Sequence, residues 1–418
     1  MSEDWIRVIH ESTRKHEAWR AQCINLVASE NVASPAVLRA LSTDLAGRYG
    51  DYAGRDLRAR KYLGNRHICE MEETVNELAR RLFRARHVEL RALSGHVAGV
   101  SILLALARPG DTILELGPHS GGHRVAAKLL QGCHLPLQVE FLEFDAEEYN
   151  LDVEGIARQV RSLRPRLVIL GSSLFLFPHP VAAIAEILRD QPDTTLAYDG
   201  SHVLGLIAGG EFQSPLEEGA DVVFGSTHKT FFGPQGGLIY SDDEELMAQI
   251  SEAVYPGLVT NHHLARVAAL GMAMAELERW GEAYGQATIG NAKQLAAELV
   301  ECGIPVVGAA SGYTESHTVL IQTQGLGKAR KLALRLEEAG IIVTDVKLPH
   351  ELGSEGLRLG AQEITRQGLR CEDMGDIAAF FERVLLRGEA PPLIYEAVRG
   401  FTQGRCAKPA FCFEEGCA

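Results

Sequence analysis

The sequence contains few cysteines, few aromatic residues and no long apolar run free of breaks. Cysteines make up 8 of the 418 residues, and aromatic residues make up 6%. The longest uncharged run, 167–185, contains two serines and a Pro-His-Pro break, which is typical of a buried strand, a loop and a helix start rather than of a membrane span. The N-terminal residues are polar and lack the apolar segment of an export signal. We therefore expect no membrane association and a reducing compartment, by default the cytoplasm.

The chain has no excess of basic residues either. Lys and Arg number 41 against 55 Asp and Glu, giving a net charge of −14. This balance argues against nucleic-acid binding, which needs a basic face. Hydrophobic residues make up 46% and charged residues 23%, which is typical of a folded globular protein. Since one core rarely grows beyond about 300 residues, 418 residues predict two domains.

Short apolar runs alternate with amphipathic helices between about 34 and 245. One helix begins at Ser34-Pro35 and buries Val37, Leu38, Leu41 and Leu45, and another carries apolar residues over 68–82. Strands are predicted at 112–116, 167–170, 195–198, 221–224 and 237–240. This alternation predicts an α/β fold with a mostly parallel sheet covered by helices on both faces.

The pattern changes after about residue 280. Helices are predicted over 282–302, 328–339 and 373–386, with strands at 319–322, 341–346 and 357–359, and a tail from 388. We therefore predict an N-terminal arm and large domain over 1–280, and a small C-terminal α/β domain with its tail over 281–418.

A lysine, Lys229, follows the predicted strand 221–224 within Ser-Thr-His-Lys-Thr. Burying an ammonium ion is costly, whereas a lysine that forms a Schiff base becomes a covalent catalyst. Taken alone, such a lysine more often lies in a surface loop. The nearby Gly-Pro-Gln-Gly-Gly at 233–237 favours the catalytic alternative, because glycines let the backbone approach a ligand closely.

An aspartate, Asp199, ends the predicted strand 195–198, and His202 follows it. Ligands of open α/β sheets lie at the carboxyl ends of strands, and a carboxylate there can keep a pyridine nitrogen protonated. An aspartate in this position can equally cap a helix, and His202 can be a structural histidine. Both alternatives stay open on these residues alone.

Two short turns complete the pattern. Ser94-Gly95-His96 precedes a helical run and offers backbone N–H groups to a phosphate. Gly121-Gly122-His123 either places an imidazole over a flat ring or forms a simple turn. Each signal is weak alone, but with Asp199 and Lys229 in this chain order they predict a large α/β domain that binds pyridoxal phosphate (PLP).

The chain resembles the serine hydroxymethyltransferase family of fold-type-I PLP enzymes from about 23 to 386. Three segments carry the resemblance: Ile-Asn-Leu-Val-Ala-Ser-Glu-Asn at 24–31, Thr-His-Lys-Thr at 227–230, and Gly-Leu-Arg-Leu-Gly at 356–360. The resemblance implies an aspartate aminotransferase-like fold and a homodimer with shared active sites. It also implies chemistry on the Cα–Cβ bond of a serine-type amino acid, through a retro-aldol step and a glycine quinonoid, with an aldehyde or one-carbon carrier as partner.

The resemblance also implies residue roles. Lys229 forms the Schiff base with PLP, Asp199 pairs with the pyridinium and His123 stacks on the ring. The implied cofactor contacts are Ser94, Gly95, His96, His123, Ser173, Asp199, His202, Ser226, His228, Lys229, Thr260 and Asn261. The implied substrate contacts are Ser29, Tyr49, Tyr62, His202 and Arg358, with an arginine suited to a carboxylate. Lys229, Tyr49, Asp51 and His123 are the implied catalytic residues.

Departures from the family pattern gather where tetrahydrofolate would lie. Asp51 replaces a glutamate, Leu63 a tyrosine, Arg124 a leucine and Gln235 an arginine, and the loop 256–261 keeps only one of the usual four glycines, Gly257. The cofactor and carboxylate residues are better retained. We therefore expect PLP and an α-amino acid to bind, whereas dependence on tetrahydrofolate is in doubt.

Three functions stay open. The first is serine hydroxymethyltransferase activity, and the second is a folate-independent aldolase or transaldolase acting on threonine-like substrates. The third is a non-catalytic relative that binds a partner or a metal, for which Cys406, Cys412 and Cys417 give slight support. Their spacing does not match a Cys-x-x-Cys pair, so no metal site is predicted. The presence of Lys229 and Asp199 argues against a non-catalytic protein.

Overall fold

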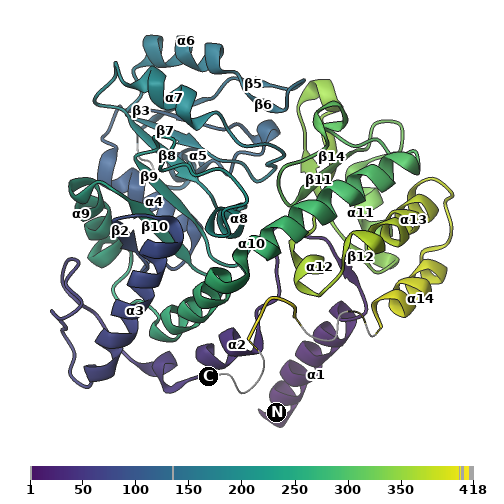
Figure 1. Ribbon diagram of the computed structural model, residues 1–418, viewed down its shortest axis with the longest axis horizontal. Helices are drawn as coiled ribbons and strands as arrows, with labels where there is room; N and C mark the ends of the chain where they lie inside the picture. The colour runs from purple at the N-terminus through teal and green to yellow at the C-terminus, as the bar shows by residue number, and fades with distance from the viewer. Residues whose placement is uncertain (1, 134–135, 404, 406–408, 414–418) are drawn as a thin grey trace.

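The computed structural model describes residues 2–133, 136–403, 405 and 409–413. Its centre is a seven-stranded sheet (Figure 1), with β8 joined in parallel to β7 and β9, and β3 in parallel to β7 and β4. The remaining strand β10 runs antiparallel to β9 and β2. In spatial order the strands are β2 (His87–Glu89), β10 (Gly237–Ser241), β9 (Val222–Ser226), β8 (Thr195–Asp199), β7 (Leu167–Leu170), β3 (Thr112–Glu115) and β4 (Gln138–Phe141). The predicted mostly parallel sheet is confirmed.

Successive residues of the central strands are apolar because helices cover both faces of the sheet. In β7, Val168 and Leu170 belong to one core, whereas Leu167 and Ile169 belong to the other. The first core includes α3 (Arg66–Phe83), α6 (Val153–Leu163), α7 (Val181–Leu188) and α8 (Leu204–Ala208). The second includes α4 (Gly95–Leu106), α5 (Val125–Cys133) and α9 (Glu244–Glu252). A short hairpin of β5 (Phe144–Asp145) and β6 (Asn150–Leu151) lies outside the sheet.

A long helix, α10 (Leu264–Glu301), runs from the large sheet to a smaller C-terminal lobe (Figure 1). The sequence predicted this helix only from residue 282. It begins earlier because its first half buries side chains such as Leu270 and Met274 in the core of the large sheet, while Leu295 and Leu299 lie in the core of the lobe. The predicted domain boundary at 280 therefore falls within α10, and the division into two domains stays a prediction.

The C-terminal lobe is built on a three-stranded antiparallel sheet. Its order is β11 (Thr318–Gln322), β14 (Glu355–Gly360) and β13 (Thr344–Lys347), and its helices are α11 (Ala329–Glu338), α12 (Gln362–Arg366), α13 (Met374–Leu385) and α14 (Pro391–Thr402). The prediction of a tail from 388 was wrong, because α14 buries Ile394, Val398 and Phe401 in the core of the lobe. Two prolines at its start, which are compatible with a first helical turn, obscured this helix in the sequence.

The N-terminal segment reaches the C-terminal lobe. After α1 (Ser2–Arg20), β1 (Ile24–Asn25) pairs in parallel with β12 (Ile341–Ile342). The next helix, α2 (Pro35–Leu41), begins as predicted, because Ser34 Oγ accepts a hydrogen bond from the Val37 N–H at 3.2 Å. Leu38 was predicted to be buried but is 54% exposed, since this short helix buries Ala36 and Val37 instead. Within the described ranges, no helix is both long and apolar enough to span a membrane.

Candidate active site

The predicted aspartate and lysine lie at the same edge of the central sheet. Asp199 is the last residue of β8, and Lys229 follows the neighbouring parallel strand β9. Both line a cavity of about 230 Å³ at the carboxyl ends of these strands, the usual place for a ligand. Burial lowers the pKa of Lys229 to about 8, although the nearby Asp199 opposes this shift. A larger fraction of neutral amine makes Lys229 a better nucleophile near neutral pH.

The structure brings most of the predicted cofactor contacts together around this cavity. The predicted residues that line it are Ser94, Gly95, His96, His123, Ser173, Asp199, His202, Ser226, His228 and Lys229. Three further lining residues, Gly171, Ser172 and Ser201, were not predicted. The signal that could have found Ser201 is its position two residues after the strand-end aspartate.

The start of α4 forms a polar cup on one side of the cavity. Ser94 Oγ accepts a hydrogen bond from the Val97 N–H at 3.1 Å and caps the helix. A Cβ atom on Gly95 would lie 2.3 Å from Ser226 Oγ, so only glycine fits here. Ser226 Oγ and Ser201 Oγ are 3.3 Å apart. A helix N-terminus with adjacent hydroxyl groups suits a phosphate.

The histidines of the cavity are held neutral by burial. His123 Nε2 lies 3.3 Å from His96 Nδ1, and burial lowers the pKa of His123 to about 4, although Asp199 opposes the shift. His202 stacks on His317 with ring centroids 5.8 Å apart, and its Nδ1 has no hydrogen-bond partner. Burial also lowers the pKa of His202 well below its usual range. Both imidazoles are therefore neutral and only weakly basic at neutral pH.

Asn31 anchors the backbone of the lysine loop. Its Nδ2 donates hydrogen bonds to the Lys229 carbonyl at 2.7 Å and to the Tyr284 hydroxyl at 3.1 Å. The Tyr284 ring in turn packs edge-on against Phe232, with centroids 5.0 Å apart. We did not predict a role for Asn31, although it closes one of the three family-like segments. These contacts fix the position of the Lys229 backbone, from which the side chain extends.

The end of the described chain packs on the same loop. Arg366 and Glu276 form a fully buried ion pair at 2.6 Å, and the Arg366 guanidinium lies 3.8 Å from the centre of the Phe232 ring. Arg366 also donates hydrogen bonds to the carbonyls of Ala410, at 2.7 Å, and Phe411. No sequence motif signals these contacts, because they join parts of the chain far apart in sequence.

A buried cation without a carboxylate partner lies next to the cavity. Arg358, in β14, donates a hydrogen bond from Nη1 to the Ser173 carbonyl at 2.8 Å, and its Nε has no partner. No ion pair of Arg358 is found in the part of the chain that the structure describes. Burial lowers the pKa of Arg358 to about 10, so it stays charged at neutral pH.

The predicted partner of Arg358, Ser29, lies in a loop fixed against the end of β14. Gln362 donates hydrogen bonds to two carbonyl oxygens that flank Ser29, at 2.8 and 2.7 Å. A Cβ atom on Gly360 would lie 2.4 Å from the Ala28 Cα, which shows how closely the two segments pack. The structure therefore holds the Ser29 loop and the strand of Arg358 together.

The remaining predicted residues do not line the Lys229 cavity. Tyr49 and Tyr62 pack edge to face, with centroids 5.2 Å apart, and line a separate surface pocket. Asp51 is buried and its Oδ1 has no hydrogen-bond partner. Thr260 and Asn261 lie between α9 and α10, outside the cavity as well. The roles of these five residues stay predictions.

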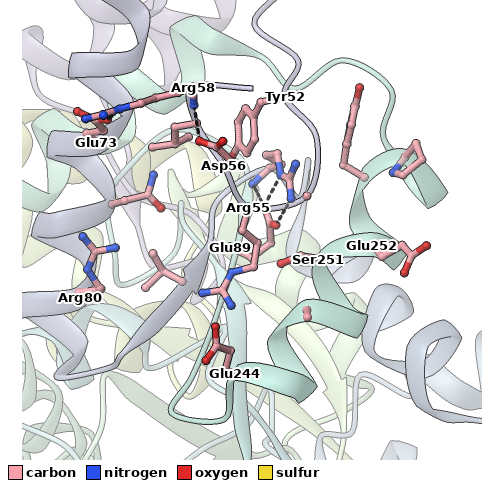
Figure 2. Close-up of a pocket in the computed structure, with 18 residues that line it drawn as sticks. Tyr52, Arg55, Asp56, Arg58, Glu73, Arg80, Glu89, Glu244, Ser251 and Glu252 are labelled. Atoms are coloured by element: carbon pink, nitrogen blue, oxygen red, sulfur yellow. Dashed lines mark hydrogen bonds and ion pairs between the residues drawn. The ribbon is translucent and has the colours of Figure 1, made fainter. Parts of the chain in front are cut away.

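A larger cavity, of about 1010 Å³, lies beside Tyr52 (Figure 2). Figure 2 shows Arg58 next to Asp56 and Glu73, and the Arg58–Glu73 ion pair measures 3.3 Å. Deeper in the wall, Glu89 pairs with the buried Arg91 at 2.6 Å. Two ion pairs thus line this cavity, and the sequence did not reveal them.

The alternative of a metal-binding protein depended on the tail cysteines. Cys406 and Cys417 lie outside the described residues. Cys412 Sγ donates a hydrogen bond to the Pro409 carbonyl at 3.1 Å. Among the residues with a described position, no three His, Cys, Asp or Glu side chains gather closely enough to hold a metal ion.

Known proteins share this architecture. The chain matches the family described as serine hydroxymethyltransferase over residues 4–381. It is 42% identical to the serine hydroxymethyltransferases of Methanothermobacter thermautotrophicus, with 93% of this chain and 92% of that one covered, and of Methanopyrus kandleri, with 92% and 90% covered. It is also similar to the crystal structure of L-threonine transaldolase from Pseudomonas fluorescens in the internal aldimine state, with a TM-score of 0.92, 29% identity, and coverage of 99% and 94%. This chain belongs to the serine hydroxymethyltransferase family.

Proposed function

We propose that the chain is a PLP-dependent enzyme that makes and breaks the Cα–Cβ bond of β-hydroxy-α-amino acids. The observation that carries the proposal is the position of Lys229 and Asp199 in one cavity, at the carboxyl ends of neighbouring parallel strands. Membership in the serine hydroxymethyltransferase family supports it. The cytoplasmic location expected from the sequence stays a prediction.

The residues present fit PLP. The cavity offers an amine with a lowered pKa, a carboxylate at a strand end, and a helix N-terminus with adjacent serines. The missing side chain of Gly95 keeps the cup open, since a Cβ would collide with Ser226. Lys229 would hold the aldehyde carbon, Asp199 the ring nitrogen, and Ser94, Gly95 and Ser226 the phosphate.

When bound, PLP supplies an electron-withdrawing ring that stabilises negative charge at the Cα of an amino acid. Asp199 supports this chemistry because its carboxylate can keep the ring nitrogen protonated. The carboxylate is fixed in place, since Asp199 Oδ1 accepts a hydrogen bond from the Ser201 N–H at 2.9 Å. The Asp199 carboxylate therefore does not have to move during the reaction. A charge that is already in place stabilises the transition state without a cost for reorganisation.

Arg358 and Ser29 orient the substrate. The buried guanidinium of Arg358 has a donor, Nε, without a partner and suits the α-carboxylate, since a guanidinium can bind a carboxylate through two parallel hydrogen bonds. Fixing that carboxylate decides which bond at Cα stands perpendicular to the ring and therefore breaks. Held geometry of this kind supplies much of an enzyme's rate.

His123 is the candidate base for the β-hydroxyl proton. Its lowered pKa keeps the imidazole neutral at physiological pH, so a ring nitrogen has a free lone pair for the proton, but the same shift makes His123 a weak base. Tyr49 and Asp51 are the alternative bases that the family resemblance implies. They lie away from the Lys229 cavity of the same chain, so they serve as bases only if a second subunit brings them there.

This supports a homodimer with shared active sites as part of the proposal. Tyr49, Asp51, Tyr62, Thr260 and Asn261 would then complete the partner's site rather than their own. The mass of the protein in solution and complementation between a Lys229→Ala chain and a Tyr49→Phe chain test this part. Activity restored by mixing two inactive variants supports shared sites, and no restoration contradicts them.

A second candidate function is a folate-independent aldolase or transaldolase. It is favoured by the structural likeness to the L-threonine transaldolase and by Arg124, which stands where the family has a folate-covering leucine. In this alternative an aldehyde other than formaldehyde leaves or enters, and tetrahydrofolate takes no part.

Two measurements test the proposal. The purified protein with PLP should show a visible absorption band that Lys229→Ala abolishes, while the same change at the exposed Lys331 leaves it intact. Cleavage of serine, threonine and phenylserine is then measured with and without tetrahydrofolate. Serine cleavage that needs tetrahydrofolate supports the first function, and aldehyde release from threonine without it supports the second. A protein without the band and without cleavage contradicts the proposal.

A further inference from the structure

Two cations lie beside the Lys229 cavity, on the segment that carries His123. Arg124 follows His123 directly, and Lys128 lies one helical turn later in α5. Lys128 Nζ is 3.4 Å from His123 Nδ1, while the other ring nitrogen of His123 faces His96 at 3.3 Å. Since His96 and His123 both line the cavity, Lys128 stands at its rim.

Neither cation has a carboxylate partner. Within the described ranges, no ion pair includes Arg124 or Lys128. The nearest acidic side chain on the preceding strand, Glu115, instead accepts hydrogen bonds from the Ala126 and Ala127 N–H groups, at 3.0 and 2.8 Å. Glu115 therefore holds the start of α5 and forms no ion pair with Arg124 or Lys128, although its charge still acts on both.

The two cations repel each other electrostatically. Like charges four residues apart repel each other, and burial and the nearby Arg124 together lower the pKa of Lys128. Lys128 is also close enough to Lys229 for its charge to disfavour the protonated amine there. Glu115 and Asp199 offset part of this repulsion, and a bound anion would offset more of it.

We infer that Arg124 and Lys128 form a subsite for a carboxylate on the side chain of the substrate. This inference rests on the proposed function and deepens it, because it names the substrate class. The α-carboxylate would bind Arg358, which lies on β14 of the C-terminal lobe and not on the α5 segment, so a substrate that uses both sites carries two carboxylates. The enzyme then cleaves a β-hydroxy-α-amino acid with an acidic side chain into glycine and an aldehyde acid, or joins these two.

The simplest probe is 3-hydroxyaspartate. Its Cα–Cβ bond breaks, the β-hydroxyl proton passes to a base, Cα gains a proton, and the products are glycine and glyoxylate. No oxidant or further reactant is needed. Its neutral isostere, 3-hydroxyasparagine, has the same shape without the second charge, so the ratio of the two kcat/KM values isolates the contribution of that charge.

The test compares this ratio in the wild-type enzyme and four variants. We expect the wild type to favour 3-hydroxyaspartate about tenfold, and Lys128→Gln or Arg124→Gln to remove most of that preference through KM. Lys128→Arg should retain it, and Lys331→Gln, which removes an exposed charge in α11, should leave it unchanged. Higher ionic strength should weaken the preference in the wild type.

Several outcomes overturn the inference. If Lys128→Gln lowers kcat/KM for both probes equally, Lys128 only positions His123. If it weakens PLP binding and leaves the ratio unchanged, the anion is the cofactor phosphate. If it weakens only tetrahydrofolate binding, the carboxylate belongs to folate. An absorption spectrum that does not respond to glycine means that the proposed function has failed, and the subsite fails with it.

Discussion

Buried charges are treated differently in two regions of this protein. Around the Lys229 cavity, Arg358 has no carboxylate partner in the described chain, and its Nε makes no hydrogen bond. Beside Tyr52, the buried ion cluster, which we define as Arg60, Glu72, Glu89, Arg91 and His262, pairs both of its arginines with a carboxylate, although the neighbouring buried Arg266 has no ion pair among the described residues. Arg60 and His262 both contact Glu72, at 2.6 and 2.7 Å, and Arg91 contacts Glu89 at 2.6 Å.

The difference separates a binding site from a structural network. An unpaired buried charge costs free energy of folding, so it is retained where a ligand supplies the missing charge. A paired cluster stabilises the surrounding segments and needs no ligand. The comparison predicts that substitutions around the Lys229 cavity change activity, whereas substitutions in the buried ion cluster change stability.

The largest effect is expected at Arg358. Arg358→Met should lower kcat/KM for amino acids about 10³-fold, because the α-carboxylate loses its charged partner. The free energy of unfolding should stay equal or rise, since the change removes an unpaired buried charge. Steady-state kinetics and urea denaturation measure both. A strong loss of stability would mean that Arg358 is part of the structural network instead.

The second effect concerns the ion cluster. Glu72→Gln should lower the free energy of unfolding by about 3 kcal/mol, because it leaves Arg60 buried without a counter-charge and weakens the contact with His262. The absorption spectrum of the bound cofactor should not change. Denaturation curves check the first expectation, and Glu73→Gln, on the exposed face of the same helix, is the matched control. A changed spectrum at normal stability would contradict the comparison.

The third effect is a pH dependence at Lys229. Below its pKa of about 8 the amine is mostly protonated, so the rate at which the apoprotein captures PLP should rise about tenfold per pH unit and level off above pH 8. The Asp199 carboxylate raises this pKa, so Asp199→Asn should move the midpoint to lower pH. Stopped-flow absorbance measures the rate. A midpoint that moves to higher pH would contradict the assigned contact.

The smallest effect is expected at Asn31. Asn31→Ala removes hydrogen bonds to the Lys229 carbonyl and the Tyr284 hydroxyl and should cost about 1 kcal/mol of stability. Because the lysine loop is then less well fixed, PLP should also dissociate faster. Dialysis against buffer without PLP tests this, with Asn76→Ala in α3 as the control. Equal dissociation rates in both variants would limit Asn31 to a structural role.

The sequence predicted the cavity better than its surroundings. Asp199, Lys229, His123 and the Ser94 turn could be predicted because each follows a recognisable strand or starts a helix, and parallel strand ends meet at one edge. The early start of α10 could not be predicted from the sequence, because the first half of this helix is stabilised by its contacts with the core of the large sheet.

Contacts between segments far apart in the sequence could not be predicted either. Arg366 finds its partners in Glu276 and in the carbonyls of the tail, and no local pattern predicts which of many charged residues will meet. The same holds for the ion cluster, whose members are spread between residues 60 and 262. The family resemblance also implies roles for Tyr49 and Asp51, which lie outside the Lys229 cavity, and these roles stay predictions.

Reduction of the protein with borohydride in the presence of PLP tests the central claim most directly. The reduction fixes the cofactor to the amine that holds it, and peptide mass mapping then identifies that amine. The account predicts one phosphopyridoxyl group per chain, on the peptide that contains Lys229, and none in Lys229→Ala. A label on another lysine at equal yield, or no label in the wild type, would contradict it.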